Sequence, residues 1–288
     1  MPAWHKLDAP DTILCIAACG DGRWLLGTSD GLYLLAGQAA EPIAPTLRGV
    51  AISALAVDPP HILVGAADGI AYSHDFGASW TYAQLPAPRQ VVQLVMSPAF
   101  AREGLAFAAA MGGGIWRSQN GGHSWEECNF GLIGREAFGL ALAPAFPLDP
   151  TVLAMLEDGL FISRTRGESW ALAPLDADAH PLSALALLPQ VWIAGSERHG
   201  LYFSTNRGAG WARRRDFSGG PIAALAASPA YQRVAVARPD GLVAVSADAG
   251  ESWTRLPRRA PEGVLVLALD DSAALLCGTQ HRGLWRYA

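Results

Sequence analysis

One eight-residue motif recurs five times in this chain of 288 residues, and it constrains the fold more than any other feature. Its first copy is SHDFGASW at residues 73–80, with serine first, glycine fifth and tryptophan last. The tryptophans of the five copies lie 45, 45, 41 and 42 residues apart. Such a period indicates a chain built from copies of one supersecondary unit. The other octads are SQNGGHSW at 118–125, SRTRGESW at 163–170, STNRGAGW at 204–211 and SADAGESW at 246–253.

The same order of segments surrounds each octad. An apolar run such as VQLVMSP comes first, followed by a β-rich run such as LAFAAA, a tight glycine turn, a strand that enters the octad and a strand that starts at its tryptophan. Four short strands in about 40–45 residues are typical of one β-propeller blade. We expect the first strand to be buried on both faces near the axis and the later strands to alternate as they approach solvent. The turn glycines are Gly69, Gly114, Gly159, Gly200 and Gly241.

Two further units lie at the ends of the chain. The segment before the first octad supplies three strands and their turns, and the segment after the last octad supplies three strands before the chain stops. The N-terminal AWHKLDAP, with Trp4, resembles SWTRLPRR and can supply the missing fourth strand. The sequence therefore predicts an all-β fold: a seven-bladed β-propeller with four-stranded blades, in which the N-terminal strand completes the C-terminal blade. We expect a single domain over 1–288, with blades at 9–47, 48–88, 89–134, 135–179, 180–218, 219–260, and 261–288 plus 1–8.

Composition and charge exclude several classes of protein. The chain is 51% hydrophobic and 16% charged, with 31 glycines and 20 prolines, which suits a large core and many tight turns. Its formal net charge of −5 does not favour a nucleic acid or an anionic membrane as a partner. No apolar stretch reaches the roughly 18 residues of a membrane span, and the N-terminus lacks the apolar core of a signal peptide. We therefore expect a soluble, cytoplasmic protein.

The four cysteines are predicted to be reduced thiols in the core. Only Cys15 and Cys19 are close in sequence, and the alternative that they bind a metal lacks a second pair of ligands. We predict neither a metal nor a cofactor. The remaining cysteines are Cys128 and Cys277.

The octads resemble the Asp-box, S-x-D-x-G-x-x-W, of BNR-repeat propellers. Proteins with this box include sialidases, some other glycoside hydrolases, sortilin-type receptors and photosystem II assembly factors. The segments SPAFAREGLAFAA and LAPAFPLDPTVLAM further resemble uncharacterised bacterial BNR-like proteins. The resemblance covers nearly the whole chain and implies the propeller architecture, but not a function.

Physical chemistry favours a structural role for the octad over a catalytic one. An Asp or Asn oxygen can accept a backbone N–H two residues on, the glycine permits positive φ, and the tryptophan can wedge against its own or the next blade. The third position drifts to Thr165 and the seventh to Gly210, which a staple tolerates and a catalytic acid does not. The predicted structural positions are Ser73, Asp75, Gly77, Trp80, Ser118, Asn120, Gly122, Trp125, Ser163, Thr165, Gly167, Trp170, Ser204, Asn206, Gly208, Trp211, Ser246, Asp248, Gly250 and Trp253.

The resemblance places ligands on the face opposite the octads. We call this the turn face, because the turns between second and third strands and the loops leading into first strands build it; the other is the octad face. Clustered arginines there would recognise carboxylate or phosphate. In the alternative they form a solvated rim, in which Arg198 pairs with Glu197 and Arg238 with Asp240. The candidate binding residues are Arg89, Arg135, His180, Arg198, His199, Arg238 and Arg282.

Catalytic constellations are weak in this sequence. The resemblance to sialidases would require a tyrosine nucleophile, but the tyrosines fall on predicted third or fourth strands or, for Tyr231, near a strand end away from the expected site. The aspartates Asp30, Asp68, Asp158 and Asp240 all precede a turn glycine, which turn chemistry alone explains. His180, Glu197 and His199 could bind a metal, although solvation is the simpler interpretation. No phosphate loop, nucleophile elbow or zinc signature occurs. The tyrosines on predicted strands are Tyr33, Tyr72, Tyr82, Tyr202 and Tyr287.

Two functions remain from the sequence. The first is a non-catalytic protein-interaction or assembly scaffold with an unidentified protein partner. The alternative is a carbohydrate- or small-anion-binding protein, or a glycoside hydrolase, that uses the arginine-bearing face. A deep axial pocket with convergent Arg198, Arg238 and Arg282 would favour the alternative, whereas a flat face would favour the scaffold.

Overall fold

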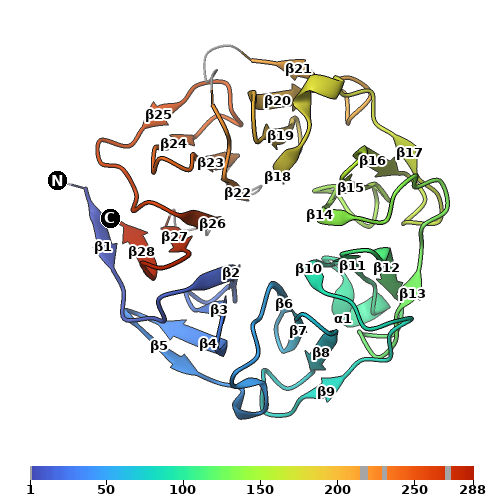
Figure 1. Cartoon of the computed structure of the whole chain (residues 1–288), viewed down its shortest axis with the longest axis vertical. Helices are drawn as coiled ribbons and strands as arrows, with labels where there is room; N and C mark the ends of the chain where they lie inside the picture. The colour runs from blue at the N-terminus through green and yellow to red at the C-terminus, as the bar shows by residue number, and fades with distance from the viewer. Residues whose placement is uncertain (1, 215–219, 229–231, 270–273) are drawn as a thin grey trace.

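Seven antiparallel sheets of four strands each surround a central axis in the computed structural model, which describes residues 2–214, 220–228, 232–269 and 274–288 (Figure 1). The predicted seven-bladed propeller is confirmed. In an antiparallel blade, alternate connections fall at the same end of the strands. The turns between second and third strands therefore share a face with the loops that lead into first strands, and the octads lie on the opposite face.

The first four sheets follow one another along the chain. The first blade contains β2 (Ile13–Ala18), β3 (Trp24–Thr28), β4 (Gly31–Ala36) and β5 (Ala39–Pro42). The second contains β6 (Ala54–Asp58), β7 (His61–Gly65), β8 (Ile70–Ser73) and β9 (Thr81–Tyr82). The third contains β10 (Val91–Met96), β11 (Ala106–Ala110), β12 (Gly114–Ser118) and β13 (Glu126–Glu127). The fourth contains β14 (Ala137–Leu142), β15 (Val152–Leu156), β16 (Gly159–Ser163) and β17 (Ala171–Leu172).

The last three sheets complete the ring. The fifth blade contains β18 (Leu182–Leu187), β19 (Trp192–Ser196), β20 (Gly200–Ser204) and β21 (Ala212–Arg213). The sixth contains β22 (Ala224–Ser228), β23 (Arg233–Ala237), β24 (Val243–Ser246) and β25 (Thr254–Arg255). The seventh contains β26 (Val264–Leu269), β27 (Leu275–Thr279), β28 (Leu284–Tyr287) and β1 (Trp4–Lys6). Three short helices lie in loops of the described chain: η1 (Pro45–Leu47), α1 (Phe100–Glu103) and η2 (Ala177–Ala179).

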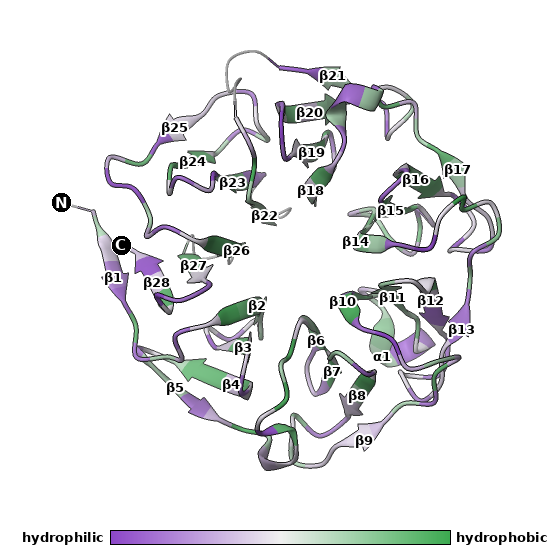
Figure 2. Cartoon of the chain, in the orientation of Figure 1, coloured by the Kyte–Doolittle hydropathy of each residue, from purple (hydrophilic) through white to green (hydrophobic). Residues whose placement is uncertain are grey.

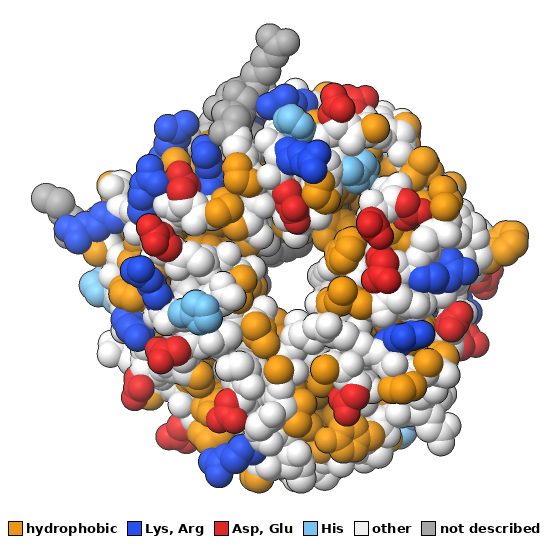
Figure 3. Space-filling model, in the orientation of Figure 1, with side chains coloured by type: hydrophobic (Ala, Val, Ile, Leu, Met, Phe, Trp, Pro, Cys, Tyr) orange, Lys and Arg blue, Asp and Glu red, His pale blue; other side chains and the backbone are white. Residues whose placement is uncertain are grey.

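In every blade the second strand is more deeply buried than the first. Every residue of β3, β11, β15, β19 and β27 is buried, whereas β2 buries only Ile13. The expectation that first strands are buried on both faces is therefore wrong. The reason is geometric: second strands lie between neighbouring blades, while the first strands line a centre that is open in Figure 3. In the hydropathy colouring, inner strands such as β10 and β26 are apolar and the outer strand β13 is polar, although the outer strand β17 is apolar (Figure 2).

The ring closes through its N-terminal strand, as predicted. β1 pairs antiparallel with β28, with Trp4 opposite Tyr287 and Lys6 opposite Trp285. The Trp4 indole N–H donates to the Arg258 carbonyl at 3.1 Å, and its ring meets that of Tyr287 edge-on at 5.3 Å. Just beyond β1, Asp8 forms a parallel bridge with Ala39 of the first blade. The N-terminal segment thus joins the last blade to the first. Within the seventh sheet β28 is paired on both sides, with β27 and with β1, so its edge is not left open.

The apolar core lies between blades. One cluster combines Phe107 of β11, Phe161 of β16 and Trp170 from the third octad. The four cysteines are free thiols, and burial raises the pKa of Cys128 and of Cys277 to about 12, so both stay protonated at neutral pH. Within the described residues, no helix is long and apolar enough to cross a membrane.

Candidate functional site

Each octad is held by its serine hydroxyl. Ser73 is buried, and its Oγ accepts the backbone N–H of Gly77 at 2.8 Å and that of Asp75 at 3.3 Å. The Asp75 carboxylate instead accepts the N–H and the hydroxyl of Ser79, at 2.8 and 2.6 Å. The aspartate therefore reaches four residues on, not two as we expected. The hydrogen bonds from Ser79 are the main reason that the pKa of Asp75 falls to about 2.

The octads whose residues depart from the S-x-D-x-G-x-x-W pattern keep most of these hydrogen bonds. The serine-to-glycine bond recurs at 2.7–3.0 Å in the other four copies. Asn120 accepts the N–H of Ser124 at 3.1 Å, and Thr165 accepts that of Ser169 at 3.0 Å. In the fourth copy Gly210 has no hydroxyl, and the described part of the chain shows no hydrogen bond from Gly210 to Asn206. The polar atoms of the octads thus point into their own turns, which leaves them little to offer a substrate.

The octad tryptophans use two kinds of partner. Those of the first two copies donate to the carbonyl of their own glycine, as Trp80 does to Gly77 at 3.1 Å. Trp170 donates instead to the Cys128 carbonyl at 2.6 Å, in the loop that follows the third blade. Contact with its own blade therefore occurs as predicted, whereas the contact of Trp170 is with the preceding blade and not with the next one.

Arg198, Arg238 and Arg282, here called the turn arginines, lie in turns between second and third strands. Two of them are paired with carboxylates on the turn face. Arg238 lies 3.7 Å from Asp240, which confirms the pairing given by the alternative interpretation, and Arg259 binds the same carboxylate at 3.0 Å. Arg282 lies 3.8 Å from Glu262. These ion pairs reduce the positive charge that a ligand would meet in this part of the face.

The third arginine differs. The backbone N–H groups of Arg198 and His199 both donate to the buried Ser196 hydroxyl at 3.1 Å, which fixes the turn. Across the described ranges, Arg198 forms no ion pair with Glu197 or any other carboxylate, so that predicted pairing is not found.

The remaining candidates lie in loops that lead into first strands. Arg89 is exposed, and Arg135 donates to the carbonyl of Gly134 at 2.9 Å. His180 is half-buried; burial lowers its pKa, opposed by the nearby Asp158 carboxylate. No group of three or more His, Cys, Asp or Glu side chains in the described chain is placed to hold a metal ion.

Two of the four turn aspartates accept backbone N–H groups. Asp158 accepts that of Gly134 at 2.8 Å, and Asp240 accepts that of Leu242 at 3.2 Å. The five tyrosines expected on strands lie on β4, β8, β9, β20 and β28. Tyr231 lies outside the described residues. No tyrosine among those described therefore adds a nucleophile to the turn face.

Charge is divided into sectors around the open centre. Figure 3 shows acidic side chains over β14–β16 and basic side chains over β22–β25. Histidines are visible over β18–β20. The fifth blade carries its histidines in the turn between its second and third strands and in the loop leading into its first strand, so Figure 3 views the turn face. On that face the fourth blade bears Glu136, Glu157 and Asp158, and none of the three forms an ion pair with lysine or arginine in the described chain.

Three exposed apolar side chains that the sequence did not predict as part of a site lie near these carboxylates. Phe130 and Ile133, 79% and 74% exposed, lie in the loop leading into β14, and Leu172, 56% exposed, lies on β17. The signal was present in NFGLIG, an apolar stretch at 129–134 whose glycines rule out a regular strand.

A histidine cluster on the octad face was also missed. The Nδ1 atoms of His61 and His74 lie 2.7 Å apart, and His123 shares a hydrogen bond with the Tyr72 hydroxyl at 2.7 Å. The rings of His74 and His123 lie 5.3 Å apart, so the cluster joins the octads of the second and third blades. Because the residues come from separate repeats, no local pattern identifies them.

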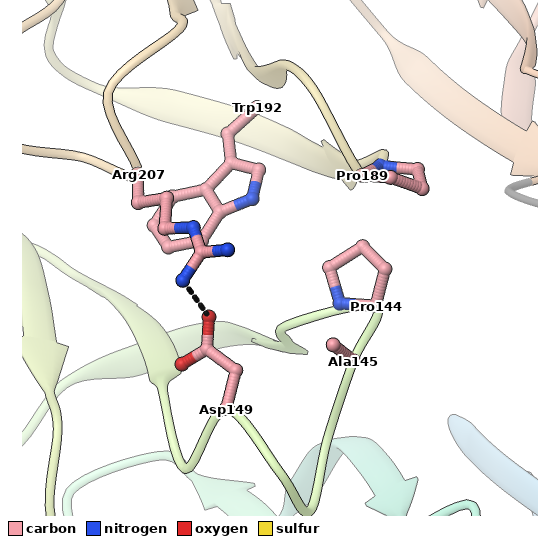
Figure 4. Close-up of a pocket in the computed structure, with 6 residues that line it drawn as sticks. All are labelled: Pro144, Ala145, Asp149, Pro189, Trp192 and Arg207. Carbon is pink, nitrogen blue, oxygen red and sulfur yellow. Dashed lines mark ion pairs between the residues drawn. The ribbon is translucent and has the colours of Figure 1, made fainter.

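A small pocket of about 180 Å³ also opens beside the fourth octad (Figure 4). Prolines Pro144 and Pro189 and the edge of Trp192 line it, and an ion pair between Arg207 and Asp149 at 3.4 Å forms one wall. The turn arginines do not contribute to its lining.

Comparison with known proteins gives the fold alone. No protein-family model matches the chain, and no curated protein matches it in sequence. Among solved structures, the GH74 xyloglucanase from Xanthomonas campestris superposes with a TM-score of 0.76 at 18% identity, over 99% of this chain and 53% of that one. The chain therefore spans about half the length of that enzyme.

Two similar structures are matched over nearly their whole length. YCF48 bound to D1 peptide gives a TM-score of 0.74 at 18% identity, over all of this chain and 95% of that one. YCF48 from Cyanidioschyzon merolae gives 0.73 at 15% identity, over 99% and 98%. The chain is thus similar in architecture to both a glycoside hydrolase and a peptide-bound propeller.

Proposed function

We propose that this protein is a non-catalytic propeller that binds a partner protein through its turn face. One observation carries the proposal: the charges of that face are divided into acidic and basic sectors around an open centre (Figure 3). A recognition surface needs such complementary patches, whereas a reaction centre needs acids and bases that converge on one point. The turn carboxylates of Asp158 and Asp240 are engaged with backbone N–H groups, which suits a structural role.

The similar structures support this choice in a limited way. YCF48 is seen with a D1 peptide bound, and we extend to this chain only the kind of ligand, a polypeptide. The xyloglucanase is matched over about half its length, and a glycosidase needs two carboxyl groups flanking the scissile bond. We also infer that the octads are Asp-boxes of the BNR type, supported by the shared serine-to-glycine bond, and that the protein works in the cytoplasm.

Affinity capture with face-specific variants tests the proposal. The tagged full chain is used to isolate partners from extracts of its native source, in parallel with Arg282→Glu on the turn face and Arg207→Glu on the octad face. Both side chains are exposed and each forms one ion pair, so the two variants are matched. We expect a specific partner that Arg207→Glu retains and Arg282→Glu loses. A partner lost only with Arg207→Glu would contradict the proposal, as would hydrolysis of a polysaccharide by the purified protein.

Small-anion binding is the second candidate, favoured by Arg198, which lies on a fixed turn and forms no ion pair within the described residues. Titration calorimetry with inorganic phosphate and with acetate measures it directly. Under this function Arg198→Gln abolishes the heat of binding, and charge reversal at Arg238 does the same if both guanidiniums share the ligand. Absence of heat with the unmodified protein would exclude these two anions as ligands.

A further inference from the structure

Three large apolar side chains project from the fourth blade into solvent. Phe130, Ile133 and Leu172, here called the apolar ledge, are all more than half exposed. Single exposed apolar residues are ordinary on a protein surface. Three on adjoining segments form a patch of the kind that marks an interaction site.

Backbone contacts bring the three residues of the ledge together. The N–H of Trp170 donates to the Phe130 carbonyl at 2.9 Å, so the loop leading into β14 lies against the start of β17. Gly131 permits this approach: its φ is +94°, and a Cβ atom there would meet the Trp170 carbonyl oxygen at 2.1 Å. A Cβ on Gly159 would lie 2.6 Å from Leu172 Cδ1, so that side chain covers the turn of the fourth blade. The ledge therefore borders the turn face.

Carboxylates lie directly beside the ledge. Asp158 accepts the N–H of Gly134, the neighbour of Ile133, at 2.8 Å. The N–H of Glu157 donates to the Glu136 carbonyl at 3.0 Å, so these two residues are neighbours, and the Glu136 carboxylate accepts the N–H of Gly112 in the third-blade turn at 3.1 Å. Figure 3 shows the result: acidic side chains over β14–β16, with hydrophobic side chains at the outer edge next to them.

One arginine lies near the ledge, and its single positive charge offsets these three carboxylates only in part. Arg135 donates to the carbonyls of its own loop, Leu132 at 3.4 Å and Gly134 at 2.9 Å. His180 lies near Asp158, and burial favours its neutral form. An anionic partner would therefore be repelled here, while a lysine or arginine side chain would be attracted.

We propose that the apolar ledge and its three carboxylates form a docking surface for a protein segment that carries basic residues next to apolar ones. The proposal rests on the protein-binding function above and specifies its partner. Burial of Phe130, Ile133 and Leu172 against apolar side chains supplies affinity, and the carboxylates fix orientation and reject acidic segments. The ion-paired arginine sector, on the opposite part of the ring, lies outside this contact and is left for other parts of the same partner.

Labelled peptides measured by fluorescence anisotropy test the surface on the full-length protein. Three peptides of one length are compared, built from lysine with leucine, lysine with serine, and glutamate with leucine. We expect the lysine–leucine peptide to bind and the other two to bind at least about tenfold more weakly. Ile133→Ser and Glu157→Lys should each weaken the lysine–leucine peptide by about tenfold as well.

Matched variants elsewhere separate specific from general attraction. Leu148→Ser removes an apolar side chain that is 94% exposed in the β14–β15 loop on the octad face, and Glu262→Lys reverses a carboxylate beside Arg282 on the turn face. Both should leave peptide affinity unchanged. Equal weakening by these controls, or equal binding of the lysine–serine peptide, would overturn the proposal. Circular dichroism checks folding, and Phe130→Ser replaces any ledge variant that does not fold.

Competition distinguishes this proposal from the broader function. If a native partner binds the turn face and the lysine–leucine peptide does not displace it, the docking surface is wrong and the protein-binding function stands. If the peptide binds as expected but no native partner depends on the turn face, the docking chemistry stands and the proposed function is wrong.

Discussion

The octad face and the turn face of this ring use their polar groups in opposite ways. On the octad face the Ser163 hydroxyl is buried and accepts the N–H of Gly167 at 2.9 Å, so its hydrogen-bonding capacity goes to the fold. On the turn face Glu157 is exposed and forms no ion pair in the described chain, and Phe130, in the loop leading into β14, is 79% exposed.

This difference shows how a repeat protein can divide its tasks. The octads repeat one pattern of internal hydrogen bonds that stabilises each blade. Their residues vary mainly where the replacement can still make those hydrogen bonds. Loops on the other face carry little of the folding free energy, so their residues can be chosen for binding. The comparison predicts large stability effects at the octads and at the closing strand, and small ones on the turn face.

Removal of residues 1–8 should have the largest effect. The deletion removes β1, exposes the edge of β28 and uncovers the surface that buried Leu7 protects. We expect the free energy of unfolding to fall by several kcal/mol, on the order seen for the loss of a core element. Urea unfolding followed by tryptophan fluorescence measures it. His5→Ala, an exposed position on β1, is the control, and an unchanged denaturation midpoint after truncation would refute closure by this strand.

Ser163→Ala tests the octad directly. The substitution leaves the N–H groups of Gly167 and Thr165 without their acceptor in a buried turn, which should cost about 1–3 kcal/mol of unfolding free energy. Glu157→Gln on the turn face should change it by less than about 0.5 kcal/mol. Chemical denaturation of both variants compares the two faces directly. Equal losses of unfolding free energy would show that the two faces do not differ in their contribution to stability.

The architecture was predictable from sequence because propeller repeats are local. Each octad places its serine, glycine and tryptophan at fixed offsets, so the period, the blade number and the role of Trp4 all follow from one alignment. Even here the detail differed: the Asp75 carboxylate accepts Ser79 and not the residue two positions on, because the tight turn folds the chain back by four residues.

The candidate site was less predictable because it depends on contacts between repeats. The pair of Arg238 with Asp240 was predictable because both residues belong to one turn, whereas the Glu262 partner of Arg282 depends on how the loop leading into β26 folds. Ile133 gains its acidic neighbour Asp158 only through the bond between Gly134 and that carboxylate. Short motifs cannot report such distances between loops.

Gly210→Ser should stabilise the protein, in contrast to the octad substitution above. The fourth octad lacks the serine whose N–H and hydroxyl bind the third residue in the first and fifth copies. A Cβ at Gly210 would lie 3.3 Å from the Asn206 amide nitrogen, a contact that a small side-chain movement relieves. Restoring the hydroxyl and reducing backbone freedom should add about 0.5–1 kcal/mol. Thermal unfolding measures the gain, and a lower midpoint would show that this octad is adapted to glycine.

The histidine cluster should give the octad face a pH dependence of its own. Burial lowers the pKa of His74, His61 and His123 lower it further, and only Asp75 opposes them. The unfolded chain therefore binds a proton at His74 more readily than the folded protein does. This contribution to stability is complete above the ordinary histidine pKa of 6.5 and is lost as the pH falls from there through the lower folded-state value.

Urea midpoints at about pH 8 and about pH 5.5, for the unmodified protein and for His74→Gln, test this dependence. We expect the variant to lose less stability on acidification, while His281→Gln, at an exposed turn position, behaves like the unmodified protein. His180, whose pKa is also lowered by burial, contributes independently and accounts for the dependence that remains. An unchanged pH dependence in His74→Gln would mean that the contact between the second and third octads does not titrate.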